Sequence, residues 1–349
     1  MKPRDILLAV TVPVLWGIGF TFAKAGLDQF PPILMTALRF TLTAVVLVWL
    51  VRPPWGMMTR IFWIALIAGT IQYSLTFTGL TGLDASTAII IVQLEVPFAV
   101  LLAVVFLKDR LDWRRVLGMA FAFGGVMLIA GEPRLNTDYL PMLLVVAGSL
   151  TWAIGQVMIK TVSRAGGVTL IAWVAMFSAP QLWLATYLFE DGQAEAIAAA
   201  DWMGWGVIIY LGLVMTAVGY ATWYHLLGKY RVSQVMPFLM LLPVTAMTGG
   251  VLLLGETVTL ITVLGAAIVI AGVGVIGIKR RPSGPAHPMT LDDARAIAAA
   301  YRESRRAGGF DIAAMEAAVM VYLKRYPEVA ETDARIFVSD LIVQAGEAP

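Results

Sequence analysis

Two ionisable side chains, Arg39 and Glu95, lie within long apolar segments of the sequence. An ionisable residue inside a membrane-crossing helix normally faces a cavity or an opposite charge, because lipid does not solvate it. Counting about 1.5 Å per helical residue, both residues fall in the same half of the membrane, where Glu95 could pair with Arg39. Alternatively, an unpaired Glu95 could face a cavity and bind a proton and a cationic substrate group in turn.

Aromatic and amide side chains near the middle of the apolar segments are further candidates for a cavity. Trp and Tyr usually lie at the two membrane surfaces, and their polar groups need partners when they lie deeper. Such rings could face a central cavity or pack between the two halves of the chain. Gln93 and Glu95 do not share a helix face, so only one of them is expected to point fully inward. The candidate cavity residues are Glu95, Gln93, Trp16, Tyr73, Trp152, Gln156, Tyr220 and Arg39.

Pro97 and Pro243 are candidate hinges. Each proline removes a helix hydrogen bond near the middle of its segment, which should leave the carbonyls of Gln93 and Leu239 without a donor. In a membrane such carbonyls need protein or cavity water. A kinked, cavity-lining pair of helices and a purely structural kink both remain open.

Several classes of protein are excluded by what the sequence lacks. It contains no Cys, which excludes disulfide scaffolds, thiol catalysis and iron–sulfur sites. Its two histidines are too few for a His-based metal site, and a net charge of +2 gives no basic face for nucleic acid. The phosphate-binding motif G-x-x-x-x-G-K-S/T is absent. We therefore expect no enzyme activity, no metal, no cofactor and no nucleic-acid partner.

The composition is that of a membrane protein with a polar end. Of the 349 residues, 59% are hydrophobic and 14% are charged, with a mean hydropathy of +0.81, whereas a soluble domain is about half apolar and about a quarter charged. The last 68 residues hold 17 charged residues. A membrane-crossing helix needs about 20 apolar residues. Ten such segments are predicted, at about 6–27, 33–51, 61–80, 87–107, 116–131, 140–159, 168–189, 203–224, 235–254 and 259–278.

Lys and Arg alternate between the predicted loops. Fifteen of them lie at the amino terminus, in the even-numbered loops and directly after the tenth segment, whereas the odd-numbered loops hold one, Arg134. Basic loops stay in the cytoplasm. Both termini are therefore expected in the cytoplasm.

The embedded part contains an internal repeat. Residues 7–24 align with residues 143–160 with seven identities in eighteen positions, and Tyr73 aligns with Tyr220 at a similar offset. Five helices per repeat is an odd number, so the second repeat must be inverted relative to the first. Inverted repeats around a midplane site are typical of transporters whose two halves alternate access to that site.

The predicted fold class is an all-α membrane protein with ten transmembrane helices in two inverted five-helix repeats, followed by a small C-terminal helical tail. The predicted domains are a first repeat at 1–131, a second repeat at 132–281, a Pro/Gly-rich linker at 282–289 and a cytoplasmic tail at 290–349. Apolar residues at helical spacing place tail helices at about 291–306, 311–325 and 333–344. The tail shows no motif, and its partner is unknown.

Two stretches carry a family resemblance: LWGIGFTFAKAGLDQFPPILMTALRF and VGYATWYHLLGKYRVSQVMPFLMLLPVTAMTGGVLLLGETVT. They resemble the EamA-type exporters of the drug/metabolite transporter superfamily, most closely the O-acetylserine/cysteine exporter branch. Over about residues 5–279, the resemblance implies two EamA repeats, a bacterial inner-membrane location and export of amino acids or related metabolites. Asp109 and Glu256, which open the fifth helix of each repeat, match the family pattern. Glu95 departs from it, because an uncharged residue, often Gln, is expected there.

Two transport functions are compatible with these features. The first is a secondary transporter that exports small metabolites, amino acids or derivatives of the cysteine-pathway type, by alternating access. The alternative is a multidrug or organic-cation exporter in which Glu95 is the counter-charge. A membrane sensor that signals through residues 290–349 is a third reading. The expected partners are a small-molecule substrate and the lipid bilayer, and protons are a candidate coupling ion.

Overall fold

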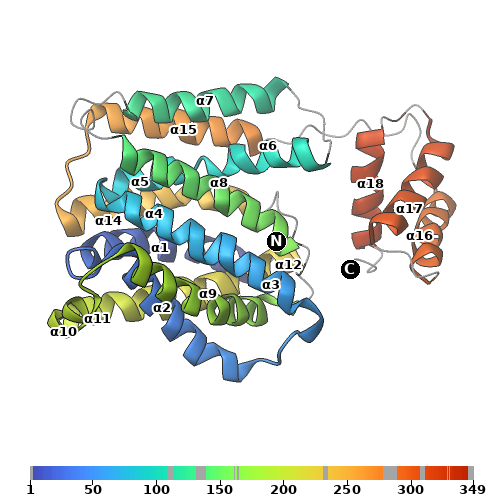
Figure 1. The fold of residues 1–349 in the computed structure, drawn as a ribbon. Helices are drawn as coiled ribbons and strands as arrows, with labels where there is room; N and C mark the ends of the chain where they lie inside the picture. The colour runs from blue at the N-terminus through green and yellow to red at the C-terminus, as the bar shows by residue number, and fades with distance from the viewer. Residues whose placement is uncertain are drawn as a thin grey trace. The chain divides into compact units, whose positions relative to one another are not determined.

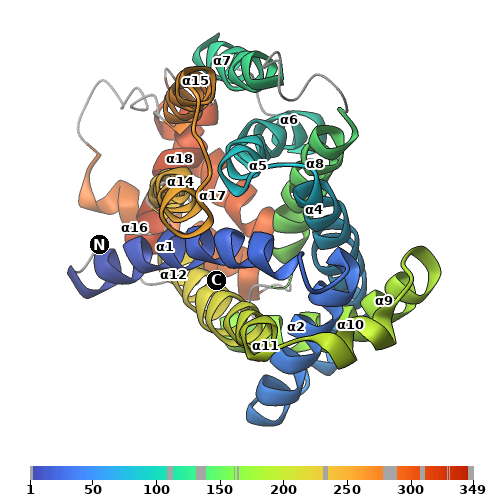
Figure 2. The ribbon, with the colours of Figure 1, turned by 90° about the vertical axis from the view of Figure 1, so that its left-hand side faces the viewer.

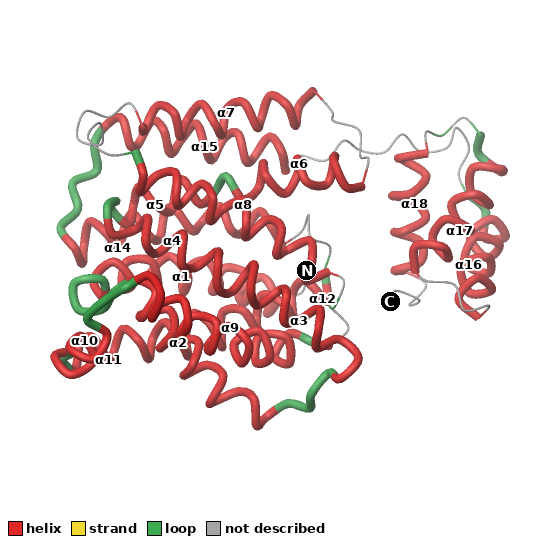
Figure 3. The backbone as a smooth tube through the Cα atoms, viewed as in Figure 1, coloured by secondary structure: helices red, strands yellow, loops and turns green. Residues whose placement is uncertain are grey.

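The computed structural model describes residues 3–107, 113–130, 139–160, 162, 165–230, 235–277, 289–306, 311–327, 329 and 331–344. Every regular element in these residues is a helix, drawn red in Figure 3. The chain forms two compact units, residues 1–278 and 279–349. The predicted boundary between the repeats at 131/132 and almost all of the predicted linker lie outside the described residues.

Unit 1 consists mainly of apolar helices. Six are long and apolar enough to cross a membrane: Pro3–Gly26, Pro32–Leu50, Trp55–Thr81, Leu140–Ile159, Gly167–Phe189 and Trp202–Leu226. Four shorter apolar helices, Ala85–Ala99, Val116–Ala130, Phe238–Leu254 and Leu260–Val275, fall in the other four predicted segments. Large apolar side chains remain exposed on the outside of the unit, for example Tyr187 and Leu252. The chain is thus a multi-pass membrane protein, and the count of ten crossings stays a prediction.

The helices of unit 1 follow one another in chain order. They are α1 Pro3–Gly26, α2 Pro32–Leu47, α3 Met58–Ile64, α4 Gln72–Thr81, α5 Ala85–Val92, α6 Glu95–Leu107, α7 Trp113–Ala130, α8 Leu140–Lys160, α9 Gly167–Phe189, α10 Gln193–Ala199, α11 Trp202–Ile209, α12 Ala221–Lys229, α14 Leu241–Leu254 and α15 Leu260–Gly277. Short 3-10 helices are η1 Val48–Leu50, η2 Trp55–Met57 and η7 Met236–Met240. Two π-helical segments, η3 Ala65–Ile71 and η6 Tyr210–Tyr220, lie between α3 and α4 and between α11 and α12.

Helices from the two halves of unit 1 pack in pairs. Helix α7 lies along α15, and α2 lies along α9; Figures 1 and 2 both show α7 and α15 side by side. Helix α1 packs against α14 and η6, and α8, its equivalent in the second half, packs against α4, α5 and α6. The core of unit 1 therefore lies between the halves, so each half depends on the other for burial.

The two π-helical segments are held by equivalent contacts. The hydroxyl of Thr43 on α2 donates to the carbonyl of Gly212 in η6 at 2.7 Å. The hydroxyl of Ser178 on α9 donates to the carbonyl of Ala65 in η3 at 3.1 Å. A π-helical segment disturbs the regular backbone ladder and often marks a functional site, and side-chain donors satisfy its carbonyls where no water is present.

Glycine allows α7 and α15 to approach closely. A Cβ added to Gly272 would lie 2.5 Å from the carbonyl oxygen of Gly118 and 2.7 Å from the backbone nitrogen of Ala122. Small residues are the usual basis of helix packing in lipid, where burial of apolar surface supplies little driving force.

The two candidate hinge prolines lie in the first turns of helices rather than in their interiors. Pro97 is the third residue of α6, and Pro243 is the third residue of α14, positions whose N–H groups have no intrahelical partner. The carbonyl of Gln93 accepts the N–H of Val96 at 3.2 Å, and the carbonyl of Leu239 also accepts a backbone N–H. The expectation that these two carbonyls lack donors is wrong, because the helix restarts just before each proline.

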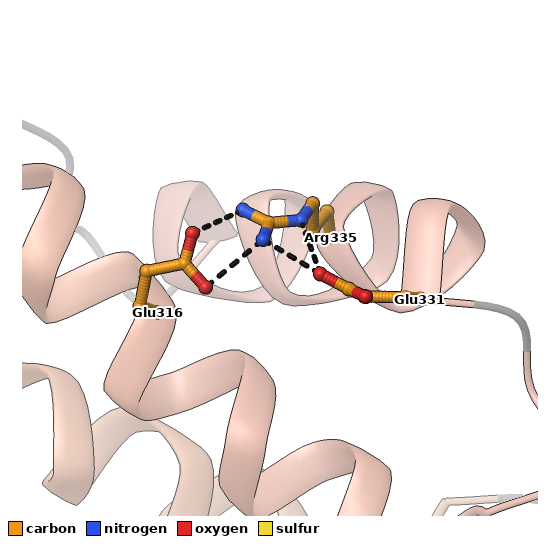
Figure 4. A network of polar contacts seen from close by, with 3 residues as sticks. All are labelled: Glu316, Glu331 and Arg335. Atoms are coloured by element: carbon orange, nitrogen blue, oxygen red, sulfur yellow. Dashed lines mark hydrogen bonds and ion pairs between the residues drawn. The ribbon is translucent and has the colours of Figure 1, made fainter. Parts of the chain in front are cut away.

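Unit 2 is a three-helix module with its own core. It contains α16 Leu291–Arg306, α17 Asp311–Arg325 and α18 Glu331–Gln344, which match the predicted ranges except that α18 begins two residues earlier. Ile297, Tyr322 and Val338 are among its buried core residues. On its surface, Arg335 of α18 donates to Glu316 of α17 at 2.5 Å and to Glu331 at 2.7 Å (Figure 4).

A buried carboxylate links the start of α16 to the end of α17. Asp293 accepts hydrogen bonds from the hydroxyls of Tyr326 at 2.6 Å and Thr290 at 2.7 Å, and it forms an ion pair with Arg325. The Tyr326 hydrogen bond, followed by that of Thr290, lowers the pKa of Asp293 to about 2. Because the carboxylate also caps α16, it fixes the register of the first two tail helices.

Candidate functional site

A small cavity lies between the two halves of unit 1. Its lining residues come from α2, α3, η3, α4, α8, α9, η6 and α12, and they are Phe40, Ile64, Ala68, Tyr73, Trp152, Gln156, Ile159, Ile171, Val174, Tyr220 and Tyr224. The volume open to the centre of a water molecule is about 20 Å³, which is room for about one water. A molecule larger than water therefore does not fit into this cavity.

Two tyrosines, one from each half, meet at this cavity. The hydroxyls of Tyr73 and Tyr220 share a hydrogen bond. Tyr73 is the second residue after η3, and Tyr220 is the last residue of η6. Each π-helical segment thus positions one member of the pair at an equivalent place in its half.

The ring of Trp16 on α1 packs against the ring of Tyr220. The two rings lie 4.7 Å apart between centroids, and the Trp16 indole N–H donates to the carbonyl of Met215 in η6 at 3.1 Å. Trp16 does not line the cavity itself. It packs between α1 and η6, the second of the two readings that the sequence left open for the deep aromatic residues.

Arg39 is completely buried and has one hydrogen-bond partner among the described residues. Its Nη2 donates to the hydroxyl of Thr216 in η6 at 2.8 Å, whereas Nε and Nη1 have no partner there. The guanidinium lies over the ring of Tyr73, with 4.3 Å between Cζ and the ring centroid. Phe40 and Phe77 lie further away, at 5.2 and 5.4 Å. An aromatic cage surrounds the cation.

Glu95 and Gln93 do not line the cavity. Glu95 is 4% exposed, and among the described residues it forms no ion pair with Arg39. The pairing that the sequence left open is therefore absent. Gln93 is also buried, and its Oε1 has no partner within the described part of the chain. Both residues lie at the break between α5 and α6.

Sequence reasoning missed several residues of this region. Phe40 and Tyr224 line the cavity, and Thr216 holds Arg39 across 177 residues of sequence. Phe and Thr are common in apolar helices, so their types carry no signal. Tyr224 follows Tyr220 by one helical turn, a spacing that could have identified it.

Carboxylates of the second half cap helices of the first half. Glu190, which follows α9, accepts the N–H groups of Ile33 and Leu34 at the start of α2, at 2.7 and 2.9 Å. Glu256, which precedes α15, accepts the N–H of Ala85 at the start of α5 at 2.6 Å. The free N–H groups and the helix dipole make a helix start a favourable place for a carboxylate.

The start of α1, at the opposite end of the bundle from these caps, is held by an ion pair. Asp5 forms an ion pair with Lys229 at the end of α12, at 2.7 Å, and accepts the hydroxyl of Tyr230 at 2.5 Å. Polar contacts between the halves therefore hold the bundle at both ends of its helices.

A second hollow of about 480 Å³ opens on the side of unit 1 and contains none of the candidate residues. Its lining is apolar apart from Thr70, Ser74, Thr78 and Gln181. Within the described part of the chain, no group of three or more His, Asp or Glu side chains could hold a metal ion.

Comparisons with known proteins extend over unit 1. The model of the EamA-like transporter family matches residues 4–131 and 140–278. Two relatives named "Probable amino-acid metabolite efflux pump", from Salmonella typhimurium and Escherichia coli, are 30% identical over 293 and 294 residues, which are 80% of this chain and 98% of each relative. A "Probable terminal-alkyne amino-acid exporter" from Streptantibioticus cattleyicolor is 27% identical over 297 residues, which are 80% of this chain and 96% of that protein.

A chain of known crystal structure has the same fold. It superimposes with a TM-score of 0.57 at 18% identity, over 79% of this chain and 96% of that chain. The family match ends at residue 278, so the tail module lies beyond it.

Proposed function

Because the chain belongs to the EamA-like transporter family, we propose that it is a secondary transporter that exports small metabolites, chiefly amino acids or their derivatives, by alternating access. It would act in the inner membrane of a bacterium, with both termini in the cytoplasm. Two relatives carry the name amino-acid metabolite efflux pump, which supports this class of substrate.

The observation that carries the proposal is the hydrogen bond between Tyr73 and Tyr220 beside the small cavity. One tyrosine comes from each half of the chain, so the bond breaks when the halves separate. A site made by both halves is what alternating access requires, because motion of one half against the other then opens the site to one side at a time.

The contacts at the two ends of the helices are suited to alternate. Opening at one end would remove Glu190 and Glu256 from the helix starts that they cap. Opening at the other end would separate Asp5 from Lys229. In the occluded state the helix caps and the ion pair would both be formed. In each open state the contacts at one end of the helices would be broken.

Glu95 is the residue that we propose for proton coupling. It is buried, and no ion pair of the described residues includes it, so it would exchange a proton when the break between α5 and α6 is uncovered. The same carboxylate would be the counter-charge in the alternative function, export of organic cations.

An efflux panel in a single host tests both functions. Cells that express the wild-type chain, the Tyr73→Phe/Tyr220→Phe double variant or the exposed control Tyr187→Phe are loaded with amino acids or with cationic drugs. We expect amino-acid efflux in the wild type and in Tyr187→Phe, and reduced efflux in the double variant. Efflux of cationic drugs without amino-acid efflux would favour the alternative function.

A further inference from the structure

Arg39 is a buried positive charge that has no counter-charge among the described residues. Arg39 is 0% exposed. The segments that pack most closely against α2 are α4, α9, α11, η1 and η6, and none of them contains an acidic residue. Glu190, which also contacts α2, accepts the N–H groups of Ile33 and Leu34 at its start. Of the two buried acids of the first half, Asp5 pairs with Lys229 and Glu95 does not pair with Arg39. A guanidinium cannot lose its proton to escape the cost of burial, so the site needs an anion from elsewhere.

The unused donors of Arg39 lie beside Tyr73, which lines the small cavity. Nε and Nη1 together carry three N–H groups, and neither atom has a partner in the described part of the chain. The guanidinium lies directly over Tyr73, which lines the cavity and bonds to Tyr220. Separation of the two tyrosine hydroxyls would expose two further donors beside the cation.

We propose that Arg39 binds the carboxylate of the transported molecule, together with the hydroxyls of Tyr73 and Tyr220. This inference rests on the proposed export function and narrows it to substrates that carry a carboxylate. In this structure the hydroxyls bind each other, and the aromatic rings of Tyr73, Phe40 and Phe77 lie around the cation. When the halves separate, the carboxylate replaces the bond between the tyrosines and receives charge-assisted hydrogen bonds.

The cavity then selects against substrates that are only cationic. A molecule with an ammonium group and no carboxylate would bring a second positive charge next to Arg39. The two like charges repel each other, so such a molecule would bind more weakly. The remaining lining is mostly aromatic and aliphatic, with Gln156 as a polar exception. Such a lining fits an apolar or weakly polar side chain on the substrate.

The test compares each acid with its amide on purified full-length protein. The probes are leucine, phenylalanine, methionine and O-acetylserine as free acids and as carboxamides, and binding is followed by quenching of tryptophan fluorescence, since Trp152 lines the cavity and Trp16 stacks on Tyr220. We expect at least one acid to bind wild-type protein about 10-fold or more tightly than its amide. In Arg39→Gln this preference is lost, and in Arg39→Lys it is weakened, because Lys lacks the planar fork of donors.

The control variant is Arg60→Gln, which removes the same charge from an exposed position and should keep the wild-type preference. Equal binding of acids and amides by wild type overturns the proposal, as does an acid preference that survives in Arg39→Gln. If Arg39→Gln does not fold, the wild-type and Arg39→Lys comparison decides alone. Failure of every acid to bind also overturns the proposal, and the efflux panel then shows separately whether the chain exports other molecules.

Discussion

Tyr73 and Tyr220 are 147 residues apart in the sequence, yet their hydroxyls share a hydrogen bond at the meeting point of the two halves. Tyr73 follows the π-helical segment η3, and Tyr220 is the last residue of the π-helical segment η6. A π-helical segment in each half therefore places one tyrosine next to the other. Both rings line the small cavity between the halves.

Removal of either hydroxyl should weaken the occluded state. Tyr73→Phe or Tyr220→Phe loses one net hydrogen bond, about 0.5–1.5 kcal/mol, and leaves the other hydroxyl buried without its partner. The double variant should be no less stable than either single variant, because the two substitutions remove the same bond. Thermal unfolding of the three variants in detergent measures this, with Tyr187→Phe as the exposed control. Additive losses of stability would show that the two hydroxyls do not interact.

Glu256 should stabilise the start of α5. Its carboxylate accepts the N–H groups of Ala85 and Ser86 and the hydroxyl of Ser86. Glu256→Gln has one acceptor oxygen in place of two, so we expect a loss of about 0.5–2 kcal/mol, the usual cost of a lost helix cap. Glu195→Gln, at an exposed position, should be unchanged. Equal melting temperatures for the two variants would contradict this role.

Glu95→Gln should leave folding unchanged and remove the coupling of efflux to protons. Because no ion pair within the described residues includes Glu95, the substitution leaves no buried cation unpaired, and membrane levels should match those of the wild type. Efflux measured across a pH series should lose its pH dependence in Glu95→Gln and keep it in Glu195→Gln. Identical rates and identical pH profiles in wild type and Glu95→Gln would remove Glu95 from the coupling step.

The membrane orientation can be tested with the cysteine-free chain. Gly56, where an added Cβ meets no atom within 4 Å, follows α2, and the exposed Ala194 lies in α10. In intact cells an impermeant thiol reagent should label Ala194→Cys and leave Gly56→Cys unlabelled until the cells are opened. Labelling of both from outside would contradict cytoplasmic termini with an odd number of crossings between these positions.

The tail module should lose stability in acid through Asp293. Its pKa of about 2 in the folded state lies below the value of about 3.9 for an unfolded chain. The ionised carboxylate therefore stabilises the fold above about pH 4, and this contribution disappears as the pH falls through about 2. Asp293→Asn should be less stable than wild type at pH 6, and the difference should vanish near pH 2.

Urea unfolding of the full chain measures this effect, with an environment-sensitive dye on Met320→Cys, a position that is 66% exposed. The neighbouring Asp292→Asn is the matched control, because the Asp292 side chain is 85% exposed. If the stability difference between wild type and Asp293→Asn is the same at pH 6 and at pH 2, Asp293 is not the group whose protonation destabilises the tail.

Hydropathy, the alternation of basic loops and the internal repeat were enough to predict an all-helical membrane protein of two halves with a separate helical tail. These features follow from the solvent: a bilayer requires long apolar helices, and the spacing of apolar residues in the tail reflects one buried face. The deep aromatic residues were identified for the same reason, since Tyr73, Tyr220 and Trp152 are polar-tipped rings far from the membrane surfaces.

Which of these side chains meet was decided by the tertiary structure alone. The partner of Arg39 is Thr216 rather than Glu95, and the prolines begin helices because the chain breaks just before them. Within one helix the spacing of residues determines which side chains share a face, but between helices 100 or more residues apart the contacts depend on packing angle, rotation and local π-helical turns. Small shifts in any of these exchange one buried neighbour for another, and a single sequence does not specify them.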